Sequence, residues 1–505
     1  MSRQVANGAR RASLLVMSTA SASTRLRQIA LYGISRGSTE GLLAARGLVL
    51  AAVLGPAAFG AWTLFRLAGR YLGLAELGIR SGLEFEVAKA GDDARGHDEV
   101  SRGADAPAVQ ETKAVRFGRA AVGFLGLVFG PIGVLALVAS FLVTDPLTTL
   151  ALRVLALTVL AERLWLYGLA YMRSTGGLRS FSILETTSAA LHLTLATLLA
   201  LRWGLIGAFG GFALAIALTL LLLRGRAPLR PSPSSDATRR MLRVGIPFGL
   251  TVGMTMALVT VDRLVVAAYG GTVLLGYYGF AVAISGMAAS GAWVVRTVVF
   301  PDVYRAVGES GGAAAASDLL KETLAPFLVL YPVLLGLASL FISPAVTLAL
   351  PQYGEAVAPA RLLIFGGATA GLSSLGSIGL AAVSRQRVLP LLAGLAFLFN
   401  LGLSAWVLSM GLGITTVAGV ALLSRVGYGG AVLSITASSS GVDAAKRLTV
   451  KWLIPLAYCV GSVAALGALL PGRDWSTALI SAGLYLLLVA PLLLAARREA
   501  RKVSW

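Results

Sequence analysis

The sequence is poor in charged residues, poorer still in acidic ones, and has a single cysteine. Charged residues make up 13% of the 505 residues, against about 25% in soluble globular domains, whereas 57% are apolar. The mean hydropathy is +0.81. Cys459 lies in an apolar run, so an intrachain disulfide is excluded and a packing role is expected. These deficits exclude a soluble globular protein and indicate a chain that crosses a membrane many times.

Long polar stretches are also missing, and no segment between the apolar runs is long enough to be a separate folded domain. A membrane-crossing helix needs about 20 mostly apolar residues. The sequence therefore predicts an all-α integral membrane protein with about fourteen transmembrane helices. The predicted spans are residues 33–55, 57–79, 118–142, 147–171, 181–201, 204–223, 244–269, 273–299, 321–343, 357–384, 388–410, 412–436, 449–470 and 475–496.

Acidic residues are outnumbered: 43 Lys and Arg stand against 23 Asp and Glu, which gives a net charge of +20. Short cytoplasmic loops retain positive charge, and an anionic inner leaflet attracts it further. With the N-terminus inside, the loops of the opposite side hold only Arg202 and Arg473. We therefore expect both termini in the cytoplasm. Nucleic-acid binding explains the charge less well, because no basic region is joined to a recognition module.

The two halves of the chain repeat each other. Residues 46–93 align with 263–309 so that Arg46 matches Arg263 and, after one gap, Gly60 matches Gly276 at a constant offset. Both copies start inside, which predicts a parallel repeat of two pseudo-symmetric six-helix bundles with substrate sites between them, near the midplane. The predicted parts are a cytoplasmic tail (1–32, too weakly apolar for a signal peptide), a first bundle (33–223), a basic Pro-rich linker (224–243), a second bundle (244–440), and two additional helices with a basic cytoplasmic tail (441–505).

Several arginines lie inside predicted spans, where a central Arg costs about 2.5–3.5 kcal/mol to insert. Five of them fall on the equivalent spans 1, 2, 7 and 8, and we predict that they line a cationic cavity: Arg46, Arg66, Arg70, Arg263 and Arg296. An excess of guanidinium over carboxylate suits an anion, and phosphate in particular, which Arg binds through two hydrogen bonds. Structural roles stay open for single residues, because Asp262 or a neighbouring helix could neutralise Arg263, and Arg296 could extend to the inner interface.

Intramembrane carboxylates commonly serve ion coupling. Asp262 and Glu40 are the candidates here for coupling to a proton or sodium gradient, although compensation of Arg263 explains Asp262 equally well. Arg153 is expected to form an internal ion-pair network with Glu162 and Arg163, and His192 to serve packing. Arg361 and Arg425 receive no role. We expect no catalytic residue, metal site or cofactor, and no nucleotide-binding loop indicates use of ATP.

Several segments of the sequence resemble a known family. The resemblance rests on AARGLVLAAVLGPAAFGAWTL with LGLAELGIRSGLEFEVAK, on VGIPFGLTVGMTMALVTVDRLVVAAYGGTVLLGYYGFAVA with VVFPDVYRAV, on LPQYGEAVAPARLLIF, and on FLFNLGLSAWVLSMGLG. Over about residues 30–440 the chain is similar to the polysaccharide transporters (Wzx-like oligosaccharide flippases) of the multidrug/oligosaccharidyl-lipid/polysaccharide exporter superfamily. The pattern is dispersed, so it is specific for the superfamily and poor for the substrate.

The resemblance implies a flippase of the bacterial cytoplasmic membrane with a V-shaped, two-bundle architecture like that of the multidrug exporters. Such a protein moves a polyprenyl-pyrophosphate-linked oligosaccharide to the outer leaflet by alternating access, for O-antigen, capsule or exopolysaccharide, and can work with other polysaccharide-assembly proteins. A flippase of the peptidoglycan lipid precursor fits the same arginines. Three alternatives fit less well. A glycan polymerase carries a sizeable catalytic loop outside, an antiporter of cationic drugs more often has an acidic cavity, and a scaffold does not need a cationic cavity.

Overall fold

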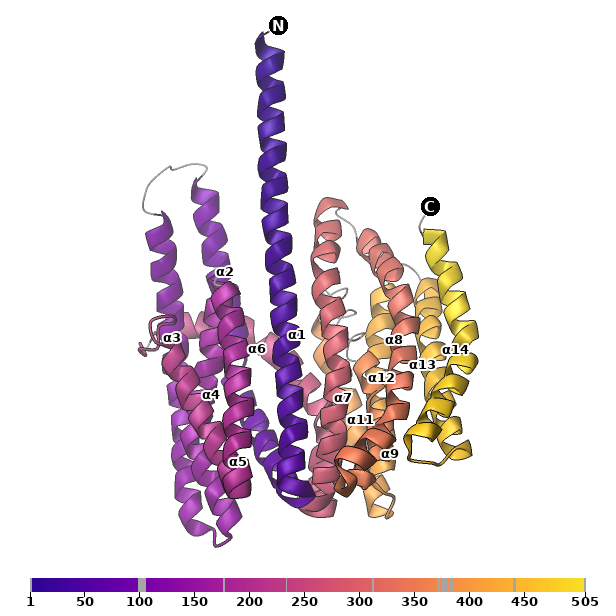
Figure 1. Cartoon of the computed structure of the whole chain (residues 1–505). Coiled ribbons are helices and arrows are strands. Elements are labelled where there is room, and N and C mark those ends of the chain that lie inside the picture. Colours follow the sequence, from indigo (N-terminus) through magenta and orange to yellow (C-terminus); the bar gives the residue numbers. More distant parts are fainter. Residues whose placement is uncertain are drawn as a thin grey trace.

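The computed structural model is built from long, roughly parallel helices (Figure 1). It describes the backbone of residues 2–98, 106–175, 178–232, 234–310, 313–369, 373, 380, 386–438 and 442–503. Side chains are described for residues 37–89, 113–175, 179–232, 234–289, 328–369, 373, 380, 387–436, 452–495 and 497. Within these ranges every element is helical, so the predicted all-α class is confirmed.

The element boundaries follow the apolar runs. The α-helices are α1 (Ser2–Leu72), α2 (Ile79–Asp98), α3 (Ala106–Leu142), α4 (Pro146–Ser174), α5 (Leu178–Leu223), α6 (Ser235–Leu258), α7 (Val261–Ser310), α8 (Ala313–Ala349), α9 (Val357–Leu363), α11 (Leu389–Ser409), α12 (Ile414–Ser438), α13 (Val442–Leu469) and α14 (Trp475–Val503). Short 3-10 segments are η1 (Gly73–Glu76), η2 (Pro351–Ala356) and η3 (Gln386–Val388).

Three long helices double back at a glycine with positive φ: Gly55 in α1 (71°), Gly204 in α5 (58°) and Gly271 in α7 (64°). This left-handed region strains residues with a Cβ atom. In α7 the turn brings the two arms together. The Tyr278 hydroxyl of one arm donates a hydrogen bond to Asp262 Oδ2 of the other over 2.8 Å. One glycine per turn therefore lets a continuous helical run supply two antiparallel arms.

The turns also account for the number of spans. Ten segments are long and apolar enough to cross a membrane, and two of them, Gly37–Glu76 and Arg179–Leu223, contain 40 and 45 residues. Each of these bends at its turn glycine and is long enough for two crossings of about 20 residues. The 29-residue α4 carries the charges of Arg153, Glu162 and Arg163. About fourteen crossings fit this arrangement, with nearly half of the tenth predicted span lying outside the described residues.

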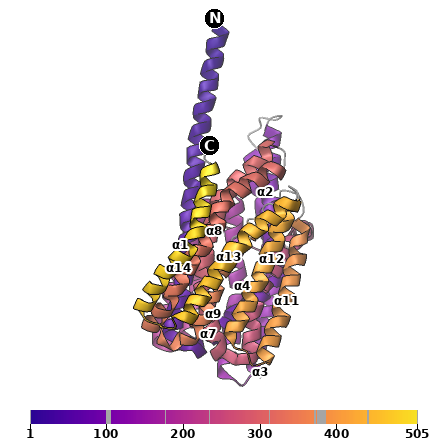
Figure 2. The ribbon, with the colours of Figure 1, turned by 90° about the vertical axis from the view of Figure 1, so that its right-hand side faces the viewer.

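The helices form two groups on either side of α1 and α7, which pack against each other in the middle (Figures 1 and 2). On one side α3, α4 and α5 pack together, with Trp62 of α1 against Phe209 and Phe212 of α5 at ring distances of 5.9 and 5.8 Å. On the other side α8, α9, α11 and α12 pack together, and α13 and α14 pack against α8. The first helix begins and the last helix ends on the same side of the molecule.

The two halves meet in a reciprocal contact at the end away from the termini. A Cβ atom added to Gly60 would lie 1.7 Å from the Thr272 carbonyl oxygen, and one added to Gly276 would lie 1.9 Å from that of Pro56. The partners are related by the same offset that aligns Gly60 with Gly276 in the sequence. This geometry agrees with a two-fold relation between bundles, and only residues without a side chain allow so close an approach.

The segment η2 closes the same end. Tyr353 is fully buried between α1 and α7, where its hydroxyl donates to the Ala51 carbonyl oxygen over 2.9 Å. Its ring stacks on Phe280 at 4.4 Å and meets Phe59 edge-on at 6.4 Å. The structure is therefore a conformation in which the two halves are joined at the end away from the termini.

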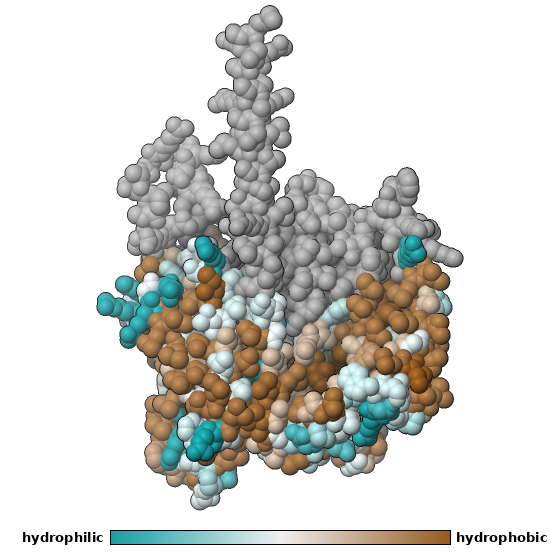
Figure 3. All heavy atoms as spheres, viewed as in Figure 1, coloured by the Kyte–Doolittle hydropathy of each residue, from teal (hydrophilic) through white to brown (hydrophobic). Residues whose placement is uncertain are grey.

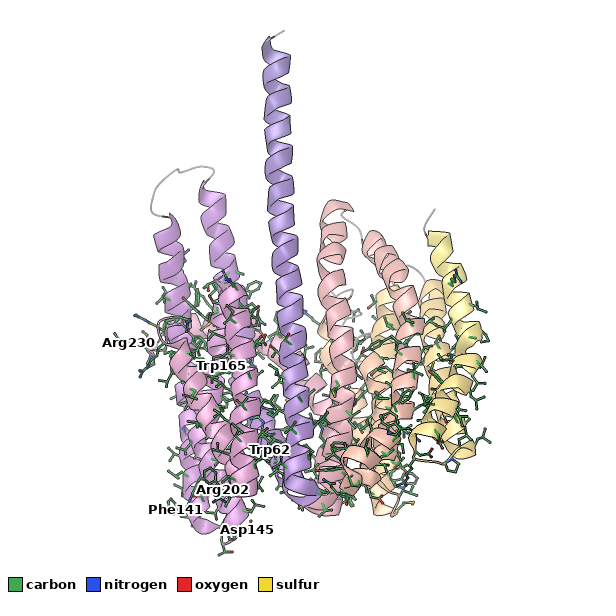
Figure 4. The ribbon with its side chains drawn as sticks, in the orientation of Figure 1. Trp62, Phe141, Asp145, Trp165, Arg202 and Arg230 are labelled. Carbon is green, nitrogen blue, oxygen red and sulfur yellow. The ribbon has the colours of Figure 1, made fainter. Side chains whose placement is uncertain are left out.

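The outer surface of the helices is apolar (Figure 3). Leu127, Leu142 and Leu487 expose 75%, 80% and 72% of their surface. Polar side chains lie nearer the ends: Asp145 and Arg202 are at one end of the first group and Arg230 is toward the other (Figure 4). Asp145 accepts the Thr148 backbone N–H over 2.7 Å and so caps α4. An apolar belt with polar ends is what a multi-pass membrane protein requires.

Candidate functional site

One acidic residue of α4 organises the charges of the first group of helices. Glu162 Oε1 accepts from Arg66 Nη2 at 3.1 Å, and Oε2 accepts from Arg163 Nη2 at 3.3 Å. The Arg66 guanidinium also lies 4.3 Å from the centre of the Phe212 ring, where a cation–π contact stabilises it. A single carboxylate thus serves two arginines, and the local charge remains positive.

Arg163 is held in place from several directions. Its Nη2 donates to the Gly69 carbonyl oxygen over 3.3 Å, and its guanidinium lies 5.8 Å from the Phe129 ring. A Cβ on Gly73 would lie 2.3 Å from Arg163 Nη1, so the glycine leaves room for this side chain. The predicted network of Arg163 and Glu162 is present, but the inclusion of Arg153 was wrong. Arg153 is exposed and lies 5.5 Å from the Phe141 ring.

Arg46 and Arg70 belong to the two arms of α1. Neither makes a hydrogen bond or ion pair with another residue in the part of the chain whose side chains are described. Their charges interact with Arg66 and Glu162, and that of Arg70 also with Glu40 and Arg263. Arg70 is exposed although these charged groups surround it, and Arg46 is partly exposed. These two guanidinium groups therefore remain available to an anion.

The second half of the chain contributes a break in a membrane helix. Between α6 and α7 the helix is interrupted at Val259 and Thr260, inside predicted span 7. The Leu258 carbonyl oxygen accepts from Asn400 Nδ2 over 3.1 Å, and the Val259 carbonyl oxygen accepts from Arg263 Nη2 over 2.9 Å. Side chains thus satisfy carbonyl groups at the break, as the low-dielectric membrane interior requires.

Asp262 lies in the first turn of α7 and is completely buried. Its Oδ2 accepts from the Tyr278 hydroxyl at 2.8 Å and from Arg425 Nη2 at 3.1 Å, while Oδ1 accepts the Arg263 backbone N–H at 2.9 Å. The carboxylate therefore compensates Arg425 of α12. No salt bridge joins Asp262 to Arg263, but the charge of Asp262 still stabilises the neighbouring Arg263 guanidinium, so the expected compensation is partly present.

A hydrogen bond connects the two arginine groups. The Tyr71 hydroxyl, next to Arg70 on α1, lies 2.8 Å from Thr260 Oγ1 at the helix break. Arg46 and Arg66 are nine and eleven residues from Gly55, and Arg263 is eight from Gly271. At 1.5 Å per residue they lie about 12–17 Å from the closed end, near the middle of a hydrocarbon core of about 30 Å. The site is therefore central in depth and shared by both halves.

The structure also places the remaining candidates. Glu40 is partly buried on α1 and interacts with the charge of Arg70. Arg296 lies in α7, but its side chain falls outside the described residues, so its role stays a prediction. His192 Nδ1 lies 2.8 Å from the Ser188 carbonyl oxygen, and its ring is 5.5 Å from that of Phe212, which agrees with the expected packing role.

The fold has known counterparts. The structure is similar to that of the lipid II flippase MurJ in an inward closed conformation, with a TM-score of 0.65, 14% identity, and 92% of this chain and 100% of that chain covered. It is also similar to an inward-facing multidrug resistance MATE family transporter of the MOP superfamily, with a TM-score of 0.60, 15% identity, and 86% and 99% covered. A third similar structure is a MOP superfamily transporter from Pyrococcus furiosus with a reversed binding-pocket polarity. Its TM-score is 0.51 and its identity 14%, with 86% of this chain and 96% of that chain covered.

At these identities the similarity shows the fold alone, which is like that of the MurJ and MATE structures. The sequence matches no protein-family model. No curated protein sequence matches it either. The predicted architecture, like that of the multidrug exporters, is thus confirmed, whereas membership of the superfamily and of its polysaccharide-transporter branch stays a prediction.

Proposed function

We propose that this chain is a lipid flippase that moves a polyprenyl-pyrophosphate-linked oligosaccharide from the cytoplasmic to the outer leaflet of a bacterial cytoplasmic membrane. It is a transporter and catalyses no covalent reaction. The chain would lie with both termini in the cytoplasm, as the distribution of Lys and Arg favours. The glycan would serve a surface polysaccharide, built together with other polysaccharide-assembly proteins.

The observation that carries the proposal is the pair of uncompensated arginines on α1, with Arg46 near mid-depth and Arg70 about 22 Å from the closed end, nearer the side of the termini. Arg46 and Arg70 have no ion-pair partner among the described side chains, while Arg66 shares Glu162 with Arg163. Unpaired cations inside a membrane are costly unless they are hydrated or meet an anion. A pyrophosphate supplies the missing negative charge and accepts two hydrogen bonds from each guanidinium.

The geometry suggests a route for such a cargo. The end near Gly60, Gly276 and Tyr353 is closed, so the arginines would receive cargo from the side of the termini. The charged head group would enter between the halves while the polyprenyl tail stays in lipid. Opening of the closed end and closure of the other would then release the head group outside, as alternating access requires.

A flippase for the lipid-linked peptidoglycan precursor is the second candidate, because its head group also carries a pyrophosphate and a flippase of lipid II shares the fold. A cation-drug antiporter is disfavoured by the excess of arginine over carboxylate around Arg46 and Arg70. Coupling to a proton or sodium gradient stays a prediction.

Deletion of the gene, with analysis of lipid-linked intermediates, tests the proposal. We expect loss of a surface glycan and accumulation of short lipid-linked units that stay inaccessible from outside, with rescue by the wild-type gene but not by Arg46→Gln with Arg70→Gln. Accumulated peptidoglycan precursor would favour the second candidate. Unchanged lipid-linked pools and surface glycans would refute both.

A further inference from the structure

The broken helix at Val259 and Thr260 has the donor set of a cation site. Unwound main-chain carbonyls and an intramembrane carboxylate are the groups with which transporters bind Na⁺ or protons. Here the Val259 carbonyl oxygen and Asp262 Oδ2 lie side by side, and Asp262 is fully buried. A carboxylate buried without a positive partner is strongly disfavoured, so something must compensate it.

The compensating charge is a side chain of the protein. Arg425 Nη2 is 3.1 Å from Asp262 Oδ2 and 3.3 Å from the Val259 carbonyl oxygen, so one nitrogen contacts both oxygens. The Arg425 side chain is only 11% exposed. A Cβ on Gly366 would lie 3.0 Å from Arg425 Nη1, so this glycine gives the guanidinium its space.

The surrounding residues provide the Asp262 carboxylate with several hydrogen-bond donors. The groups that face Asp262 are Tyr278 and Arg263 of α7, Arg425 of α12 and, across the halves, Tyr71 of α1. Asp262 accepts three hydrogen bonds from these groups, with lengths of 2.8–3.1 Å. The neighbouring Asn400 amide donates to the Leu258 carbonyl oxygen and its Oδ1 accepts from Ser404, so these oxygens are also engaged.

We propose that Arg425 acts as a tethered cation: its guanidinium occupies the cation position of the broken-helix site, so that this chain needs neither Na⁺ nor a proton at Asp262. Asp262 and Arg425 then form a fixed ion pair between spans 7 and 12. The inference concerns the energy source of the proposed translocation. Its test uses no cargo, so the result does not depend on whether the proposed function is correct.

The test uses the full-length protein, purified in detergent, and follows thermal unfolding by tryptophan fluorescence at pH 8. Melting temperatures are compared in NaCl and in choline chloride at equal ionic strength. The variants are Asp262→Asn, Arg425→Gln and the two combined. Arg163→Gln is the matched control. It also removes a buried arginine from a carboxylate, but Glu162 keeps its ion pair with Arg66.

We expect the wild type to melt at the same temperature in both salts. Arg425→Gln should melt at least about 5 °C lower in choline, because it leaves a buried charge unpaired, and should regain at least half of that loss in Na⁺. The double variant should be more stable than Arg425→Gln in choline, and the control should not respond to Na⁺.

Two results would overturn the proposal. One is stabilisation of the wild type by Na⁺ that Asp262→Asn abolishes, since Asp262 would then bind a cation despite Arg425. The other is an Arg425→Gln variant without any response to Na⁺, which would reduce the pair to an ordinary structural ion pair.

Discussion

The contact of Gly60 and Gly276 at the closed end allows a sharp perturbation. In Gly276→Ala the new Cβ would lie 1.9 Å from the Pro56 carbonyl oxygen and 2.7 Å from its carbonyl carbon. Real Cβ atoms keep at least 3.0 Å from such atoms, so the backbones of α1 and α7 must separate by about 1 Å. Neither partner is the flexible end of a side chain, and local adjustment cannot relieve the contact.

The size of the effect follows from the cost of overpacking. Inserting a methyl group into a tightly packed contact costs about 1–3 kcal/mol. This cost applies only while the end is closed, so it shifts the equilibrium toward a conformation in which the end is open. At about 1.4 kcal/mol per factor of ten, the closed state should lose about 5- to 150-fold in population relative to the open one.

Thiol labelling measures this shift. The single cysteine, Cys459, is buried and can be replaced by Ala, and Ala51→Cys places a reporter at a buried position whose carbonyl oxygen accepts from Tyr353. We expect Gly276→Ala to raise the rate of labelling of this reporter by a membrane-impermeant maleimide at least about 5-fold. Gly286→Ala is the matched control on the same helix, because a Cβ there meets nothing within 4 Å. Equal labelling rates in the two variants would refute the steric reasoning.

Three further predictions follow. Arg46→Gln and Arg70→Gln should leave the melting temperature within about 2 °C of the wild type and abolish cargo transport, because neither side chain makes a hydrogen bond or ion pair with another described residue; a large loss of stability without loss of transport would contradict this. Glu162→Gln should lower the free energy of unfolding by about 3–5 kcal/mol, because it leaves Arg66 and Arg163 without their shared carboxylate; a denaturation midpoint equal to the wild type would contradict it. Tyr71→Phe should cost about 1 kcal/mol by loss of the bond to Thr260, which denaturation in detergent can measure, with Tyr269→Phe, an exposed tyrosine, as control.

Periodicity and repeats predicted the fold well, because membrane helices depend on patterns that a sequence carries directly. The constant offset between Gly60 and Gly276 reappears as reciprocal contacts with Thr272 and Pro56. The break at Val259 was not predicted, since the run from Ala257 to Tyr269 is apolar around its charged pair and has no Pro or Gly to mark an interruption.

The pairing of the charges was harder to predict. Arg425 stands alone in an apolar run, and its partner Asp262 is distant in the sequence, so only the tertiary fold brings them together. Helix geometry could have excluded two of the expected pairs. Adjacent helical residues point in different directions, which separates the side chains of Asp262 and Arg263. Arg153 and Glu162, nine residues apart, lie on opposite faces of a helix with 3.6 residues per turn.

The central claim is that the unpaired arginines of α1 carry a lipid-linked pyrophosphate head group across the membrane. Its most direct test is to reconstitute the protein into vesicles that contain a polyprenyl-pyrophosphate-linked oligosaccharide. The fraction of this oligosaccharide that an external glycosidase can digest is then measured. The wild type should make the inner-leaflet pool digestible, whereas the variant with both Arg46→Gln and Arg70→Gln should leave it protected, as protein-free vesicles do. Equal digestion with the wild type and the double variant, or no digestion of the inner pool with either, would contradict the account.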